Sequence, residues 1–181
     1  MINELQRVIN TTPSNSHARI AVAKYLLDAG ETAKAWAALD SLPGQFASSR
    51  PARFLKAQIA HSAGRYPEAI GHYLALRRQA SAAERIDLNL AECYFRSNQP
   101  ARAAEYFSYS VNPYQHNNFE PHHLYMYAVS LAASGEQHKA TRMAQAFRNN
   151  YPADHELAPA VTKLLEDLNG ARGRLDKADT P

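Results

Sequence analysis

The sequence predicts an all-α protein built from repeated pairs of antiparallel helices. Three observations support this fold class. Alanine occurs 33 times and glycine 7 times in 181 residues, which favours helix because alanine loses least, and glycine most, on adopting a helical backbone. Small turn residues recur along the chain at a nearly constant spacing. Alanines keep a constant register about those turns, so the repeat predicts the architecture.

The repeat is centred on Gly30, Gly64, Asn98 and Gly135, which are separated by 34, 34 and 37 residues. An alanine stands seven residues before and five residues after each of them, giving Ala23, Ala35, Ala57, Ala69, Ala91, Ala103, Ala128 and Ala140. Helices whose backbones cross closely need small residues there, and Gly or Asn ends a helix in the left-handed conformation. We therefore expect tight turns between two helices at these four positions.

The best copies of the repeat carry a more specific pattern. Residues 64–76 read GRYPEAIGHYLAL, with Ala69 and Tyr73 four residues apart. Residues 90–107 repeat it with Leu90, Ala91, Tyr94, Ala103 and Phe107. These segments resemble tetratricopeptide repeats, whose 34-residue unit is a helix, a tight turn and an antiparallel helix. The resemblance implies a right-handed superhelical solenoid of antiparallel helix pairs.

The repeat register assigns the segments of the chain in order. We expect a half repeat at 2–12, with Leu5 and Val8 facing inward, and then full repeats at 16–47, 50–81, 84–115 and 121–152. A capping helix at 155–168 follows, because its apolar residues have the spacing of one buried face. Residues 1–168 would form a single domain. Residues 169–181 are expected to be a flexible tail, since Gly, Pro and charge occur there without a period.

Two departures from the family pattern stand out. Arg53 and Lys56 occupy first-helix positions at which the resemblance implies bulky apolar residues. The three extra residues before the last repeat fall in the loop 111–120. A long loop can be a binding element, but surface loops also tolerate insertions, so both interpretations stay open.

The sequence predicts no enzyme, no cofactor and no metal site. It lacks phosphate-binding, dinucleotide-binding, metalloprotease and nucleophile-elbow motifs. Cys93 stands next to Tyr94 inside a helix and is expected to pack as a small apolar group. His122 and His123 would point about 100° apart on a helix, and no cysteine or carboxylate completes a ligand set with them or His116. We expect His122 to face the groove, and His123 to be exposed or capping.

Basic residues concentrate between positions 50 and 78, where Glu68 is the only acid against Arg50, Arg53, Lys56, Arg65, Arg77 and Arg78. Nucleic acid is an unfavoured partner, because aromatic stacking residues do not alternate with these bases along one face. A solvated basic face or a site for an acidic partner is the preferred interpretation.

The resemblance implies that the first helix of each repeat lines a concave groove. The positions it places there include Ile20, Lys24, Leu27, Phe54, Gln58, His61, Arg85, Leu88, Glu92, Phe95, His122 and Tyr125. Apolar members of this set would anchor an extended peptide or an amphipathic helix, while polar members fix its register. The predicted function is a non-catalytic protein-binding or scaffold module. Alternatively, the apolar members of this set would serve self-association or pack against the chain's own tail.

Two further functional interpretations stay open at this stage. One is a dedicated chaperone of a bacterial secretion system, and the other is a repeat fragment of a larger membrane-anchored or multidomain protein. A single cysteine and the lack of a signal peptide or membrane span predict a cytoplasmic chain without membrane insertion. A fragment would be periplasmic or membrane-tethered.

The resemblance also bears on which tails the groove would accept. Family members that hold the acidic tails of heat-shock chaperones use a two-carboxylate clamp. The matching positions here are Ile20, Lys24, Leu55, Arg85 and Asn89, of which only Arg85 agrees in charge. We therefore expect no such clamp.

Overall fold

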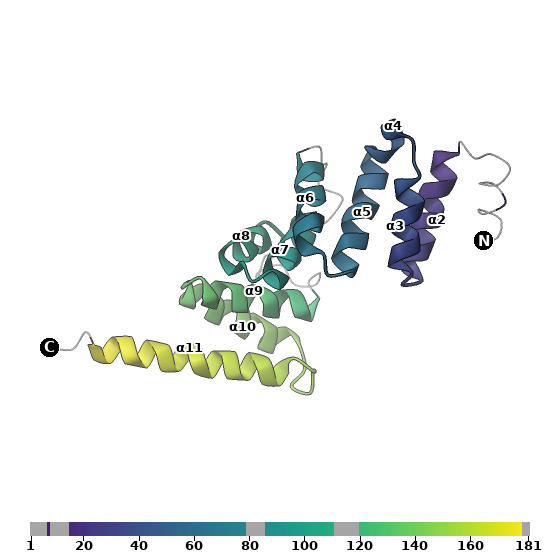
Figure 1. Cartoon of the computed structure of the whole chain (residues 1–181). Coiled ribbons are helices and arrows are strands. Elements are labelled where there is room, and N and C mark those ends of the chain that lie inside the picture. Colours follow the sequence, from purple (N-terminus) through teal and green to yellow (C-terminus); the bar gives the residue numbers. More distant parts are fainter. Residues whose placement is uncertain (1–6, 8–14, 79–85, 111–119, 179–181) are drawn as a thin grey trace. The chain divides into compact units, whose positions relative to one another are not determined.

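A computed structural model describes residues 7, 15–78, 86–110 and 120–178, with side chains as far as Ala171 (Figure 1). Of the expected half repeat at 2–12 only Arg7 lies within the described residues, and Leu5, Val8 and the loop at 111–119 lie outside them. The described ranges contain helices and no strand. The all-helical prediction is confirmed.

The first two repeats form helix pairs as predicted. Helices α2 (Ser16–Asp28) and α3 (Thr32–Asp40) make the first pair, and α5 (Arg50–Ser62) and α6 (Tyr66–Arg77) make the second. The Asn15 side chain caps α2 by accepting a hydrogen bond from the Ala18 amide at 3.0 Å. A short helix, α4 (Gly44–Ala47), precedes α5 and has no counterpart in the sequence prediction.

The later repeats follow the same plan. Helices α7 (Ile86–Arg96) and α8 (Pro100–Ser110) form the third pair, and α9 (Pro121–Ala133) and α10 (Gln137–Asn150) form the fourth. The last helix, α11 (Ala158–Ala178), packs on α10. None of the described helices has the length and apolar character needed to cross a membrane.

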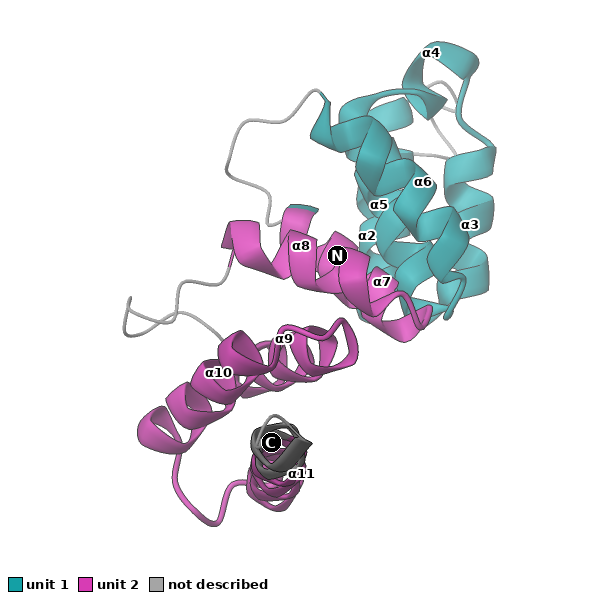
Figure 2. Cartoon of the chain, turned by 90° about the vertical axis from the view of Figure 1, so that its left-hand side faces the viewer, with its two compact units in different colours: residues 1–86 teal, residues 87–181 magenta. Residues whose placement is uncertain are grey.

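The chain divides into two compact units, Met1–Ile86 and Asp87–Pro181, coloured separately in Figure 2. The sequence predicts one domain over 1–168, whereas the division falls between the second and third repeats. Each repeat of a solenoid contacts only its neighbours, so a stack has no central core that would hold all of its repeats in one compact body.

The four predicted turns adopt the left-handed conformation. The backbone angle φ is 77° at Gly30, 71° at Gly64, 55° at Asn98 and 86° at Gly135. The residue after each turn position donates its amide to a carbonyl five residues back; in the second repeat, for example, Arg65 donates to Ala60 at 2.8 Å. This is the Schellman pattern, which satisfies carbonyls left open at a helix end. The expected turns are confirmed.

The eight alanines of the repeat register are all buried. Larger side chains fill the space around them, and within the third repeat the rings of Tyr94 and Tyr106 stack with centroids 5.3 Å apart. In the second unit, Phe107 and Tyr127 join α8 to α9 at 5.6 Å. Small residues at the crossings and aromatic residues between them thus explain the close pairing of the helices.

Helix α11 is longer than the sequence predicts. Val161, Leu165 and Leu168 are buried, in agreement with a capping face. The helix, however, continues to Ala178 instead of ending at residue 168, so the tail expected over 169–181 is wrong as far as residue 178. No proline occurs between Pro159 and Pro181, and Ala, Arg, Leu and Lys in this stretch favour helix enough to offset two glycines.

Candidate partner-binding groove

The first helices of unit 1 carry six of the predicted groove residues on α2 and α5, which pack against each other. Ile20 and Leu27 are half-buried and pack against the core of this unit. Phe54 is also half-buried, and its ring lies edge-on to Tyr73 at 6.2 Å. These apolar groups keep part of their surface exposed, so a bound segment could bury more of it.

The polar groove residues of unit 1 are held by local contacts. Lys24 is exposed and forms an ion pair of 2.9 Å with Asp28, one turn further along α2. The ring of His61 lies 5.8 Å from that of Tyr66, and Gln58 is half-buried. An exposed ion pair of this kind contributes little stability, so Lys24 can exchange Asp28 for a partner's carboxylate at small cost.

In unit 2 the predicted groove residues lie on α7 and α9. Glu92 and Phe95 on α7, and His122 and Tyr125 on α9, are half-buried. Leu88 is only 5% exposed, so its assignment to the groove surface is wrong. Ile86 and Leu90 on the same helix are buried as well. Arg85 lies outside the described residues.

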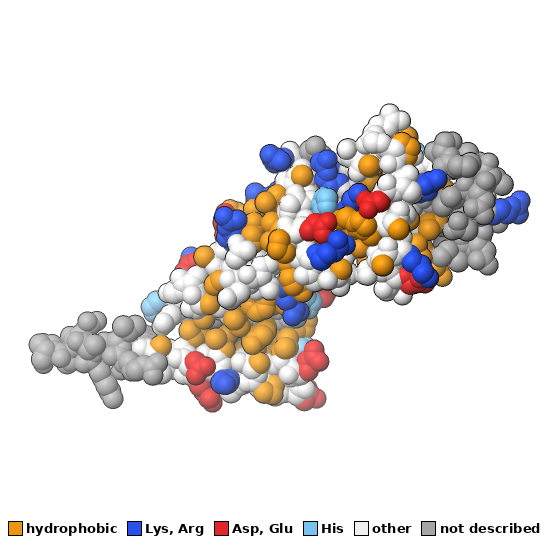
Figure 3. Space-filling view, viewed as in Figure 1, with side chains coloured by type: hydrophobic (Ala, Val, Ile, Leu, Met, Phe, Trp, Pro, Cys, Tyr) orange, Lys and Arg blue, Asp and Glu red, His pale blue; other side chains and the backbone are white. Residues whose placement is uncertain are grey.

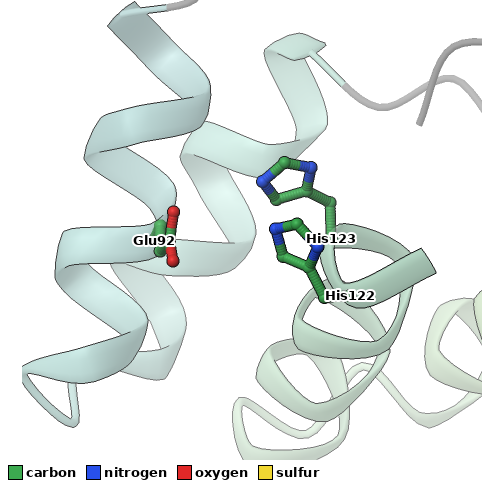
Figure 4. A group of neighbouring side chains, drawn as sticks. All are labelled: Glu92, His122 and His123. Carbon is green, nitrogen blue, oxygen red and sulfur yellow. The ribbon is translucent and has the colours of Figure 1, made fainter. Parts of the chain in front are cut away.

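His123 differs from the sequence prediction. It is 6% exposed, neither solvent-exposed nor a helix cap, and its ring lies 6.3 Å from Phe107 and 3.9 Å from His122. Glu92 approaches both imidazoles, and the nearest ligand atoms of the three residues all lie within 4.8 Å of one another. A carboxylate thus lies beside the two imidazoles, which the sequence did not predict, because α7 supplies it from 30 residues earlier (Figure 4).

Sequence reasoning also missed a cluster around Trp36 in unit 1. The indole ring lies 5.2 Å from the ammonium of Lys56, 4.3 Å from the guanidinium of Arg65 and 6.3 Å from the ring of His72. On the face shown in Figure 3, basic, acidic and histidine side chains gather around hydrophobic ones over α3, α5 and α6. The basic stretch at 50–78 was visible in the sequence. It did not indicate that the tryptophan would lie among these basic residues.

Acidic partners partly neutralise this basic stretch. Lys56 pairs with Asp40 at 2.7 Å and Arg65 with Glu68 at 2.9 Å. Burial lowers the pKa of His72. The negative charge of Glu68 raises this pKa in part, and nearby positive charges lower it again. The neutral form of this imidazole is thus favoured between the cations.

Two further aromatic residues are exposed, Tyr25 on α2 at 41% and Tyr109 on α8 at 54%. Tyr25 adjoins Lys24 in sequence but falls outside the groove positions that the family register assigns. Its exposure could not be predicted from the repeat pattern. The hydroxyl of Tyr109 donates a hydrogen bond to Glu105 at 3.0 Å, one turn earlier in the same helix.

Cys93 is buried, as predicted. Burial raises the pKa of its thiol to about 12, and the charge of Glu92 adds to the shift. A thiol nucleophile requires the thiolate form, so the environment of Cys93 argues against a catalytic role and supports packing.

Comparison with known proteins agrees with the helix pairs and their turns. A sequence model of the tetratricopeptide repeat family matches residues 20–84 and 54–118. Among solved structures, the chain resembles YrrB, described as a TPR protein with an unusual peptide-binding site, with a TM-score of 0.72, 17% sequence identity and 93% of each chain covered. Comparison with curated proteins found no match. The chain belongs to the tetratricopeptide repeat family.

Proposed function

We propose that the chain is a non-catalytic protein-interaction module that binds an extended peptide or an amphipathic helix of a partner protein. The observation that carries the proposal is the partial burial of three aromatic side chains on first helices. Phe54 on α5, Phe95 on α7 and Tyr125 on α9 are each half-buried. Each of them therefore keeps some exposed surface for a partner.

Half-buried aromatic residues suit this role for a physical reason. An aromatic side chain has few rotatable bonds, so fixing it against a partner costs little conformational entropy, while it offers a large apolar area to bury. Such residues are enriched among those that contribute most binding energy. Membership of the repeat family supports the same function, as does the peptide-binding site named for the structurally similar YrrB.

Polar residues beside these aromatics would set the register of the bound segment. Lys24 and Gln58 serve this purpose in unit 1. In unit 2, Glu92 and His122 lie on the two first helices that also carry Phe95 and Tyr125. The preferred partner therefore has spaced apolar anchors with a few charged or polar groups between them.

The proposal is tested by selecting peptides from a displayed random library against the full chain and titrating the best binder by calorimetry. Phe54→Ala, Phe95→Ala and Tyr125→Ala should each weaken binding by about 1–3 kcal/mol if the residue is a buried anchor. Tyr109→Ala, which removes an exposed aromatic residue from a second helix, is the matched control and should leave affinity unchanged. Helicity is followed by circular dichroism to exclude unfolding.

Two outcomes would contradict the proposal. If the three aromatic variants bind as the original chain does, the first helices do not form the binding surface. If only Arg85→Ala weakens binding, or if the affinity disappears at high salt, recognition is electrostatic and the apolar anchors play no part.

A further inference from the structure

Three potential metal ligands from two helices converge in unit 2. Glu92 lies on α7, and His122 and His123 lie in the first turn of α9. Each offers one ligand atom, and these three atoms lie within 4.8 Å of one another. Figure 4 shows both imidazole rings turned toward α7, with one nitrogen of each facing the carboxylate of Glu92.

The fold holds this group in place. His123 is almost fully buried, with its ring 6.3 Å from Phe107 of α8. The rings of His122 and His123 lie 3.9 Å apart with 48° between their planes, so the adjacent histidines do not diverge as a regular helix surface would suggest. A binding site is stronger when its ligands are positioned before the ligand arrives, because less entropy is lost on binding.

A second carboxylate orients one of the imidazoles. The Nδ1 of His122 lies 3.4 Å from the carboxylate of Glu120. Histidines that bind metals commonly direct their other ring nitrogen to a carboxylate, which fixes the ring and raises its basicity. This contact occupies Nδ1 and leaves Nε2 of His122 as the donor atom for an ion.

We propose that Glu92, His122 and His123 bind a divalent transition-metal ion of the Zn²⁺ class. Two imidazoles and one carboxylate form a known three-ligand set for zinc. Imidazole favours Zn²⁺, Ni²⁺, Cu²⁺ and Co²⁺ over Mg²⁺ and Ca²⁺, which prefer oxygen ligands. The negative charges of Glu92 and Glu120 also offset the unfavourable effect of the positive end of α9 on a cation.

The required adjustment is small. Ligand atoms around a tetrahedral zinc ion lie about 3.3 Å apart, given bond lengths of about 2.0–2.1 Å. The observed separations of up to 4.8 Å would close through side-chain torsions of the half-buried Glu92 and His122. Three protein ligands leave at least one coordination position for water or an outside ligand. The site shares Glu92 and His122 with the proposed peptide-binding surface, so a metal ion and a bound peptide would share or compete for these two side chains.

The experiment uses the full chain, stripped with a chelator and then titrated with ZnCl₂ by calorimetry. We expect one ion per chain with a Kd below about 10 μM. Glu92→Gln and His122→Ala should each weaken binding by at least about tenfold, since even changes to residues behind metal ligands cost about 10–100-fold. His138→Ala, which removes an exposed histidine from α10, is the matched control and should bind like the original chain.

Additional measurements separate a true site from surface binding or misfolding. Co²⁺ in place of Zn²⁺ should produce visible absorption bands of a low-coordinate ion, and these should be lost in His122→Ala. Mg²⁺ should not compete. Glu92 and His122 are half-buried, so their variants should retain the helicity of the original chain. Equal zinc affinity in all variants, or no binding at one ion per chain in well-folded protein, would overturn the proposal.

Discussion

Lys56 lies over Trp36, with its ammonium nitrogen 5.2 Å from the centroid of the indole ring. The same nitrogen pairs with the Asp40 carboxylate at 2.7 Å, and the Lys56 side chain is only 17% exposed. The family pattern calls for a bulky apolar residue at this position. The aliphatic part of Lys56 supplies the apolar surface between α3 and α5, while its charged end reaches Asp40.

This arrangement predicts that packing by Lys56 matters more than its charge. Lys56→Met keeps an unbranched chain and should cost less than about 1 kcal/mol, the size of a cation–π contact and an ion pair whose acidic partner, Asp40, is exposed. Lys56→Ala removes several methylene groups and should cost about 1–2 kcal/mol. Urea unfolding followed by circular dichroism measures both. Lys34→Ala, at an exposed site on α3, is the control, and equal losses for Met and Ala would show that the charge dominates.

Two residues of α6 should respond oppositely to enlargement. Ala69 is fully buried, so Ala69→Leu should destabilise the chain by about 1–3 kcal/mol through overpacking. Gly71 is exposed, and a Cβ added there would meet no atom within 4 Å. Gly71→Ala should therefore stabilise by up to about 1 kcal/mol, because alanine is the better helix former. Thermal unfolding that shows unchanged stability in Ala69→Leu would contradict the close crossing of these helices.

The lowered pKa of His72 predicts a stability that depends on pH. The unfolded chain binds a proton at this residue near the usual pKa of 6.5, whereas the folded chain resists it because of burial. Protons therefore favour the unfolded state, and stability should fall as pH drops below about 6.5. The variant His72→Gln should lose less stability than the original chain between about pH 7.5 and pH 5.5. The same slope of melting temperature against pH in both proteins would show that His72 makes no contribution.

Cys93 should react slowly with thiol reagents while the chain is folded. Its pKa of about 12 compares with an ordinary value of 9.0, so the thiolate fraction at neutral pH is lower by about a thousandfold. Burial also blocks access. Labelling rates with a chromogenic disulfide should rise by about a hundredfold or more when urea unfolds the chain. Rapid labelling in native buffer would mean that α7 opens often or that the thiol is not buried.

The sequence by itself determined the helix pairs and the turns between them. Gly30, Gly64 and Gly135 adopt positive φ because such a conformation is accessible to glycine without strain, and Asn98 is the next most tolerant residue type. The alanine register could be predicted because close helix crossings exclude larger residues. These are local or near-local constraints, so 34 residues of sequence contain the information that determines them.

Only the tertiary structure decided which side chains meet across helices. Glu92 reaches His122 and His123 because α7 and α9 lie together, and Lys56 is covered because Trp36 lies opposite it. The burial of Leu88 is likewise set by what packs around α7. Such contacts depend on side-chain directions and on residues distant in sequence, and helical periodicity defines only the face of one helix at a time. The continuation of α11 to Ala178 could not be predicted from the sequence pattern either. The polar residues beyond residue 168 form no periodic face and favour helix only through backbone propensity.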